Sequence, residues 1–367
     1  MIEDLIYILI KKQIYIFNMK GRNILVTGSS GLIGSEVVKF FAYEGYKVFG
    51  VDNNMREIFF GKKGSTLANL ESLKNSFKDF TNYSIDIRDR KEIFKLVSDI
   101  KPVLIVHTAA QPSHDKAASI PILDFEVNAL GTLNLLEAAR ENCIDSPFIH
   151  LSTNKVYGDN PNKLDLMELD NRWEYSGSYF KKGISEDFSI DHTTHSLFGV
   201  SKASSDLLVQ EYGRYFDMPT CCLRGGCLTG PSHSGVELHG FLNYLIRCNL
   251  RKDEYTIFGY KGKQVRDNIH SFDVANFISE FFKSPKKGAV YNIGGGYKNS
   301  ISLIESIKKI ESISDIKMNY KYDKNPRVGD HICYYSNLEK IQSDFPNWVL
   351  SKDLDAIFND VFNNLIS

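Results

Sequence analysis

Short apolar runs alternate with helical spacings of apolar residues along the first part of the chain. Asn23–Thr27 is an apolar run that leads into glycines, and residues 35–43 carry apolar side chains at intervals of three and four. Residues 46–51 form a second apolar run, which ends at Asp52. Short apolar runs predict strands, and intervals of three and four predict a helix. The segment therefore predicts a strand, a glycine-rich turn, a helix and a second strand, which is a βαβ unit.

The same alternation continues further along the chain. Apolar runs predict strands at residues 83–87, 104–108, 148–152 and 220–224, and helical spacings separate them at residues 91–100, 124–141 and 201–216. This order predicts an α/β fold with a Rossmann-type doubly wound parallel sheet. After about residue 231 the pattern is less regular, which predicts a smaller, mostly C-terminal lobe over the carboxyl ends of the strands, where open α/β sheets bind ligands.

The change of pattern also predicts how the chain divides. We expect an N-terminal extension, a Rossmann domain and a ligand-binding lobe, at residues 1–19, at 20–230 with about 268–295, and at about 231–267 with 296–367. Lys11 and Lys12 interrupt the apolar N-terminal stretch, which is too short to span a bilayer. Acidic residues precede it, unlike the basic start of a secretory signal. We expect an extension ahead of the functional start, with a peripheral amphipathic anchor as the alternative.

The charge balance excludes several classes of partner. The chain has 44 Lys and Arg residues against 45 Asp and Glu, a formal net charge of −1. Such a balance disfavours nucleic-acid binding and stable membrane association. The six cysteines form no Cys-x-x-Cys pair and the histidines form no zinc pattern, so we expect a cytoplasmic protein without a metal site.

A glycine-rich turn joins the first predicted strand to the first helix. Gly28 permits the tight turn, Gly31 lets backbone N–H groups approach a pyrophosphate, and Gly34 lets the helix pack closely on the sheet. Asp52 ends the second strand, where a carboxylate binds the adenine ribose hydroxyls and repels a 2′-phosphate. This pattern predicts NAD rather than NADP. The other residues that we expect at the cofactor are Leu32, Ile33, Asn53, Asp86, Ile87, Ala109, Ala110 and Asn128.

Several ordered motifs extend this pattern. They are the glycine turn of residues 27–34, Asp-Ile at 86–87, His-Thr-Ala-Ala at 107–110, Ser-Thr-Asn-Lys-Val-Tyr-Gly at 152–158, Lys202, and Gly-Lys-Gln-Val-Arg-Asp at 262–267. From about Gly21 onward, the chain resembles the extended short-chain dehydrogenase/reductase family. The resemblance implies reversible oxidation of a nucleotide-activated sugar with NAD. It also implies a possible homodimer, by analogy with family members that pair through helices.

The resemblance implies a catalytic set of Ser or Thr with Tyr-x-x-x-Lys. Thr153 matches the residue that holds the reacting oxygen, and Lys202 matches the lysine that binds the nicotinamide ribose. Phe198 stands where the family has its proton-transferring tyrosine, and a phenyl ring accepts no proton. Loss of a general acid–base typically costs about 10²–10⁴-fold in rate. The sequence thus keeps the frame of the site and lacks the phenol.

Three explanations of Phe198 stay open. Another group takes the proton, with Lys202 and His114 as candidates and His195 and Tyr157 as weaker ones. Alternatively, Phe198 is an introduced change that traps a complex. The third explanation is a protein that binds NAD and a nucleotide sugar without turnover.

The residues after Thr153 bear on the reaction type. Sugar 4,6-dehydratases of the family have an Asp-Glu pair there, which removes water from the sugar, whereas this chain has Asn154 and Lys155. The resemblance therefore implies epimerisation, with a CDP-hexose 2-epimerase as the favoured case. A net nucleotide-sugar oxidoreductase is a further alternative.

The nucleotide sugar needs cationic partners for its diphosphate. Arg266 suits a bidentate phosphate contact, and Arg327 resembles a second family arginine. The remaining residues that we expect at the sugar or nucleotide are Gln111, Ser113, Asn154, Lys155 and Gln264.

Overall fold

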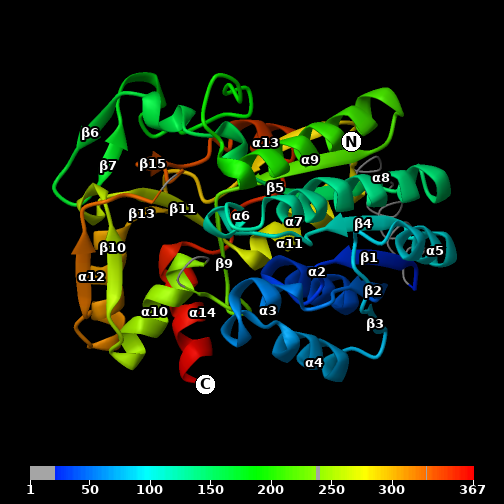
Figure 1. The fold of residues 1–367 in the computed structure, drawn as a ribbon, viewed down its shortest axis with the longest axis horizontal. Coiled ribbons are helices and arrows are strands. Elements are labelled where there is room, and N and C mark those ends of the chain that lie inside the picture. The colour runs from blue at the N-terminus through cyan, green and yellow to red at the C-terminus, as the bar shows by residue number, and fades with distance from the viewer. Residues whose placement is uncertain (1–20, 237–239, 328) are drawn as a thin grey trace, which may run out of the picture.

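A seven-stranded parallel sheet forms the centre of the molecule in the computed structural model, which describes residues 21–236, 240–327 and 329–367 (Figure 1). The strands lie in the order β12-β8-β5-β4-β1-β2-β3, and each neighbouring pair is parallel. They are β1 (Asn23–Thr27), β2 (Lys47–Val51), β3 (Phe80–Tyr83), β4 (Leu104–His107), β5 (Phe148–Thr153), β8 (Thr220–Gly225) and β12 (Ala289–Ile293). The order reverses direction at β1 and β4, so the predicted doubly wound α/β sheet is confirmed.

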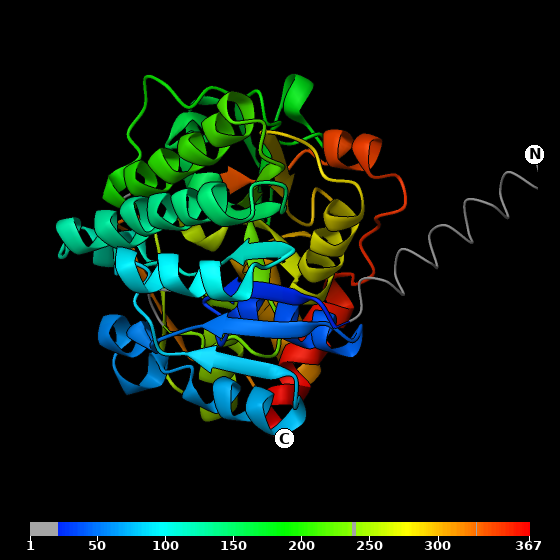
Figure 2. The same cartoon turned by 90° about the vertical axis from the view of Figure 1, so that its right-hand side faces the viewer.

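Helices cover both faces of this sheet because its strands are apolar on both sides. Ile24 and Val26 face one apolar cluster, which includes residues of α2 (Leu32–Tyr43) and α11 (Ser271–Lys283). Leu25 faces the other cluster, which includes residues of α5 (Arg90–Ile100) and α8 (Gly131–Asn142). Figure 2 shows the sheet between these helical layers. The helices of the larger unit are α2 (Leu32–Tyr43), α3 (Met55–Phe60), α4 (Leu67–Ser76), α5 (Arg90–Ile100), α6 (His114–Ala117), α7 (Pro121–Phe125), α8 (Gly131–Asn142), α9 (Ser196–Tyr215), α11 (Ser271–Lys283) and α13 (Glu339–Asp344).

Several elements differ from the sequence prediction; the helix predicted at residues 201–216, for example, is α9 (Ser196–Tyr215) and begins five residues earlier. The third strand ends at Tyr83 instead of starting there, because its only neighbour in the sheet, β2, ends at Val51, the residue paired with Tyr83. The apolar residues that follow, including Ile87, pack under the helices instead. The helix predicted at residues 124–141 is divided by a π-helical turn at Glu126–Leu130 between α7 and α8.

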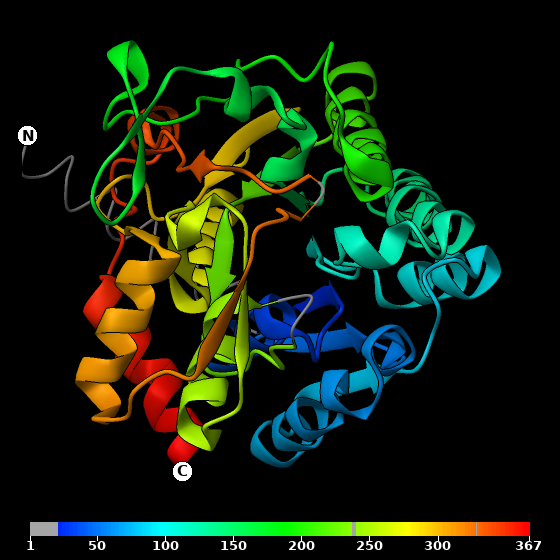
Figure 3. The same ribbon diagram turned by 60° about the vertical axis from the view of Figure 1, so that its left-hand side comes forward.

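A smaller lobe stands at the carboxyl ends of the strands (Figure 3). Its helices pack on one another through buried Leu245, Ile307 and Phe358. The helices are α10 (Phe241–Arg251), α12 (Leu303–Ser314) and α14 (Leu354–Ile366). Its strands are β6 (Leu166–Glu168), β7 (Trp173–Tyr175), β9 (Cys227–Thr229), β10 (Tyr255–Phe258), β11 (Val265–His270), β13 (Ser300–Ser302), β14 (Tyr320–Asp323) and β15 (Cys333–Tyr334).

The hairpin of β6 and β7 belongs spatially with the lobe, since Tyr175 shares a buried cluster with Cys333 and Tyr334. The exact division of the chain between the two units stays a prediction. The expected extension at residues 1–19 lies outside the described residues. Across the described ranges, no helix combines the length and the apolar character needed to cross a membrane.

Candidate active site

One cavity of about 450 Å³ runs along the carboxyl ends of the strands and under the smaller lobe. Its wall includes Gly28 after β1, Asp52 after β2, Ala109 after β4 and Thr153 at the end of β5. Ends of parallel strands meet at one edge of a sheet, so these distant residues become neighbours. The predicted cofactor residues Gly31, Leu32, Ile33, Asn53, Asp86, Ile87 and Ala110 also line it.

The glycine turn is crowded by backbone at Gly28 and Gly34. Gly28 has a φ of +67°, and a Cβ there would lie 2.7 Å from the backbone nitrogen of Ala109. A Cβ on Gly34 would lie 2.0 Å from the carbonyl oxygen of Gly28. Gly34 does not line the cavity, so its role is the close packing of α2 on the turn. This crowding leaves the N-terminus of α2, with Gly31 and Leu32, at the cavity wall, which fits a pyrophosphate.

The Asp52 carboxylate is held at the edge of this cavity. Its Oδ1 accepts from the Asn54 nitrogen at 2.8 Å and its Oδ2 from the Ser30 nitrogen at 3.0 Å. Two backbone donors hold the carboxylate in one orientation while it still lines the cavity. A carboxylate held in this way fits a ribose diol.

The candidate reaction centre combines Thr153 with a turn of α9. The Thr153 Oγ1 accepts from the Lys155 nitrogen at 3.2 Å and so caps the following turn, Asn154–Tyr157. Phe198 and Lys202 both border the cavity. The Lys202 Nζ donates to the Leu151 oxygen at 2.7 Å, and burial lowers the pKa of Lys202 to about 8. Such an amine loses its proton far more readily than an exposed lysine.

Charged residues gather at the lobe side of the cavity. Arg266 from β11 and Asp330 form an ion pair of 2.5 Å, and Arg327 pairs with Asp115. The Lys155 Nζ donates to the Gly329 oxygen at 2.7 Å, which ties the end of β5 to the lobe. Burial lowers the pKa of Lys155 to about 8.

His114 belongs to the same group of charges. Its Nε2 lies 3.5 Å from the Arg327 Nη2. Burial, followed by nearby Lys155, lowers the pKa of His114 to about 4, so the imidazole is neutral at pH 7. Five of the predicted substrate residues line the cavity: Asn154, Lys155, Gln264, Arg266 and Arg327.

Three predicted ligand contacts lie outside the cavity wall instead. Gln111, Ser113 and Asn128 are buried in a hydrogen-bond network around Asp124. The Asn128 Oδ1 accepts from the Gln111 backbone nitrogen at 3.0 Å, and the Asn128 Nδ2 donates to the Gln111 backbone oxygen at 3.1 Å. The Gln111 amide donates to Asp124 at 2.7 Å. Each of the three residues is at most 1% exposed. Their hydrogen bonds hold the loop after β4 against α9, so their polar atoms are not free to bind a ligand.

The side chains of two weaker candidate bases, Tyr157 and His195, form hydrogen bonds away from the cavity. The Tyr157 Oη donates to the Asn292 Oδ1 at 2.8 Å in a fully buried position, and burial raises its pKa. The His195 Nε2 lies 3.0 Å from the Val156 oxygen. Neither residue lines the cavity. Adjacency in sequence to Phe198 or Thr153 therefore does not bring these groups to the reaction centre.

The sequence did not reveal the apolar part of the cavity wall. Phe241, Tyr255, Phe258 and Leu303 line it from the smaller lobe. Arg56 also lines it, and its Nη2 donates to the Ser234 oxygen at 2.8 Å. The four lobe residues come from separate segments whose approach depends on the docking of the lobe, and no local motif marks them.

Comparisons with known proteins agree with this geometry. A model of the NAD dependent epimerase/dehydratase family matches residues 24–294. The chain belongs to this family. The motif resemblance is thereby confirmed at the level of the epimerase/dehydratase family, whose members are NAD-dependent enzymes of nucleotide sugars.

Relatives of several activities occur within the epimerase/dehydratase family. The chain is 32% identical to CDP-paratose 2-epimerase of Salmonella typhi, over 90% of this chain and 96% of that protein. It is 30% identical to dTDP-glucose 4,6-dehydratase 1 of Escherichia coli, over 77% and 75%. UDP-glucuronic acid 4-epimerase of Bacillus cereus, in complex with UDP-glucuronic acid and NAD, superposes with a TM-score of 0.77 at 25% identity, covering 94% of this chain and 99% of that one.

Proposed function

We propose that the protein is an NAD-dependent epimerase of a nucleotide diphosphate sugar, with a CDP-hexose as the favoured substrate and carbon 2 as the favoured centre. One observation carries the proposal: a single cavity is lined by the dinucleotide turn, by Thr153 and Lys202, and by the Arg266 and Arg327 cations. The identity to a CDP-paratose 2-epimerase across nearly its whole length supports the favoured case.

The cofactor end of the cavity fits NAD. NAD, when bound, supplies the reversible oxidation of a carbinol to a ketone. Gly28 and Gly31 would lie along its pyrophosphate, and Asp52 would accept from the adenine ribose hydroxyls. In an epimerase the sugar is first oxidised to a ketone and then reduced again. The cofactor therefore returns to its oxidised state and need not leave the protein.

The proton of the sugar hydroxyl requires an acceptor, and we assign that role to Lys202. Phe198 has no acidic or basic group, whereas Lys202 borders the cavity one helical turn away. Its pKa of about 8 makes the neutral amine accessible near physiological pH. Thr153 would hold the reacting oxygen by its hydroxyl. His114, also neutral and at the cavity, is the remaining alternative acceptor.

The sugar end of the cavity supports epimerisation over dehydration. A 4,6-dehydration needs an acid and a base beside the sugar, and Asn154 and Lys155 supply no carboxylic acid. Both residues line the cavity beside Thr153 and offer hydrogen bonds to sugar hydroxyls. Arg266 and Arg327 would match the two charges of the diphosphate, and Gln264 would contact the ribose or sugar.

A specific observation favours a second candidate. Phe198 removes the family phenol, so a protein that binds NAD and a nucleotide sugar without turnover would keep every other feature of the cavity. A net oxidoreductase is distinguished from both, since it would release reduced cofactor.

One experiment tests these functions together. The purified protein is incubated in D₂O with CDP-, UDP-, GDP- and dTDP-hexoses, including CDP-paratose, and the sugar is followed by NMR. The proposal expects inversion at one carbon of a CDP-hexose, with protium kept at that carbon because the removed hydrogen is returned. Binding of a sugar without inversion and without nicotinamide reduction would establish the non-catalytic candidate instead. Stoichiometric accumulation of free NADH would indicate the oxidoreductase.

A further inference from the structure

Two buried histidines lie beneath Lys202. His150 on β5 and His107 on β4 are side by side, with ring centroids 5.0 Å apart, and each is 1% exposed. Neither lines the cavity, and the reaction outlined above uses neither. Burial, followed by the nearby charge of Lys202, lowers the pKa of both imidazoles. Both rings are therefore neutral, and each has one donor and one acceptor nitrogen.

The hydrogen bonds of His107 determine its tautomer. The Thr132 hydroxyl donates to the Asn128 oxygen at 2.7 Å, so it must accept from the His107 Nε2, 2.9 Å away. The His107 Nδ1 then accepts from the Thr27 hydroxyl at 2.7 Å. Both ring nitrogens are satisfied by threonines, and His107 has no capacity left for Lys202.

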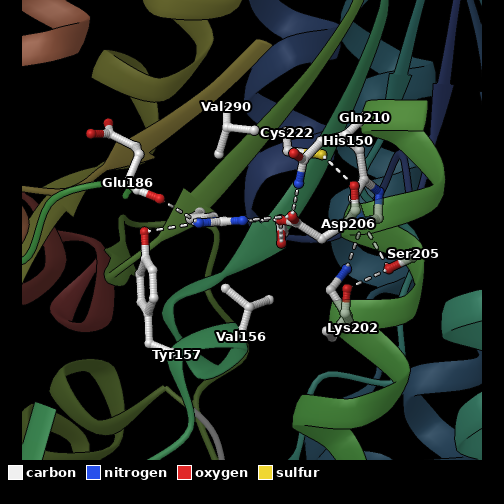
Figure 4. A network of polar contacts seen from close by, with 12 residues as sticks. His150, Val156, Tyr157, Glu186, Lys202, Ser205, Asp206, Gln210, Cys222 and Val290 are labelled. Carbon is white, nitrogen blue, oxygen red and sulfur yellow. Dashed lines mark hydrogen bonds and ion pairs between the residues drawn. The ribbon is translucent and has the colours of Figure 1, made fainter. Parts of the chain in front are cut away.

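His150 is in a different position. Its Nε2 lies 3.2 Å from the Lys202 Nζ and 3.1 Å from the Ser205 Oγ (Figure 4). Its Nδ1 is buried and has no hydrogen-bond partner among the described residues. The Ser205 hydroxyl donates to the Lys202 backbone oxygen at 2.9 Å. Because the Lys202 ammonium has only N–H groups, its contact with the His150 Nε2 requires that nitrogen to accept, which places the His150 proton on Nδ1. The Ser205 hydroxyl, which donates to the Lys202 oxygen, leaves this lone pair to the lysine.

The geometry of an amine gives this contact a consequence. A lysine nitrogen has three positions besides its carbon, each filled by an N–H or by a lone pair. The Leu151 oxygen takes one N–H of Lys202 at 2.7 Å, and the His150 Nε2 takes a second at 3.2 Å. One position is left, and Lys202 borders the cavity. In the neutral amine that position is the lone pair, and in the ammonium it is the third N–H.

We propose that His150 is a positioning residue for proton transfer: as a neutral acceptor behind Lys202, it leaves one amine position for a reacting hydroxyl and stabilises the ammonium once the proton arrives. This inference rests on the proposed function, in which Lys202 takes the sugar hydroxyl proton. His150 acts only through Lys202 and touches neither sugar nor cofactor. A hydrogen bond to a charged group is stronger than one to its neutral form, so the contact favours the protonated amine.

The other groups that face Lys202 set the background charge. Asp206 on α9 and Asp124 on α7 each favour the ammonium, whereas burial keeps the Cys222 thiol on β8 uncharged. Asp206 is engaged with Arg224 at 2.9 Å, and Asp124 accepts from Ser201 at 2.6 Å. Both carboxylates already have partners, whereas His150 makes a direct contact with Nζ.

The test follows the titration of Lys202 without using turnover. Full-length protein is prepared with ¹³Cε-labelled lysine, the Lys202 signal is assigned from its loss in Lys202→Arg, and its pH midpoint is measured. In the native chain we expect a midpoint near pH 8. His150→Leu removes the acceptor and is expected to lower the midpoint by about one pH unit. His150→Gln keeps an acceptor at similar reach and is expected to stay close to the native midpoint.

The matched control is His107→Leu, which removes a histidine of equal burial that has no bond to Lys202. It is expected to leave the midpoint unchanged. If His150→Leu fails to fold, His150→Asn replaces it. Its amide is shorter and is not expected to reach the Lys202 Nζ, so the same lowering of the Lys202 midpoint is expected. An unchanged midpoint in the acceptor-free variants, or an equal shift in His107→Leu, would overturn the inference. Absence of turnover with every nucleotide sugar would contradict the proposed function alone, since the titration is independent of it.

Discussion

Phe198 and Lys202 lie one helical turn apart on α9, and both border the cavity that holds the dinucleotide turn. Phe198 is the position at which the family resemblance predicts a tyrosine, while Lys202 is buried against β5 and its pKa is lowered to about 8. This relationship makes the proton acceptor the main chemical question in the molecule.

Phe198→Tyr tests whether a lost phenol limits the rate. With Lys202 as acceptor, we expect kcat to change by less than about tenfold, because the proton already has a destination. Steady-state kinetics with the converted nucleotide sugar measure it, with Phe198→Leu as a control for packing. A gain of about 10²–10⁴-fold would instead identify the phenol as the missing acid–base.

Lys202→Met tests the acceptor directly. Removal of the amine is expected to lower kcat by about 10²–10⁴-fold while the protein stays folded, because Met fills a similar buried volume. The native rate should rise with pH through about 8, since only the neutral amine accepts a proton and burial lowers its pKa to that value. A pH–rate profile that instead rises through about 4 would assign the role to His114.

Arg266→Met tests the ion pair at the lobe. Arg266 and Asp330 are paired at 2.5 Å, and both side chains are mostly buried. Loss of one partner leaves a buried charge, so we expect a loss of about 3–5 kcal/mol in the free energy of unfolding and weaker sugar binding. Denaturant unfolding and calorimetric titration measure the two effects. The double variant Arg266→Met with Asp330→Asn should recover much of the stability and none of the binding, and recovery of both would contradict a phosphate role for Arg266.

Gly34→Ala and Gly31→Ala form a matched pair at the dinucleotide turn. A Cβ on Gly34 would lie 2.0 Å from the Gly28 oxygen, whereas a Cβ on Gly31 would meet only that oxygen, at 3.2 Å. We expect Gly34→Ala to lose about 1–3 kcal/mol more stability than Gly31→Ala, because backbone must move. Thermal unfolding and the NAD content of the purified protein measure the difference. Equal losses would contradict the packing role of Gly34.

Much of the fold and the cofactor end of the site follow from local pattern. β1 starts and ends where its apolar run predicts, and the turn after it carries the glycines that backbone crowding requires. Asp52 is at the cavity because the residue that ends a parallel strand must lie at that edge of the sheet. The ends of β1, the glycine turn and the position of Asp52 depend on neighbours close in sequence or on the order of strands and helices. The spacing of apolar residues and the turn residues indicate both.

The remaining parts of the site depended on the tertiary structure. Gln111 follows β4 and Asn128 lies in the next helical segment, and polar residues at such positions are expected to contact a ligand. In the structure they instead form hydrogen bonds with each other and with Asp124. Arg327 lies beside His114, 213 positions away, because the lobe docks over the loop after β4. The sequence by itself determined the sheet, the dinucleotide turn and the absence of a phenol at Phe198. Only the tertiary structure decided which polar groups face the cavity, because a side chain binds whichever partner the packed lobe and helices bring within reach.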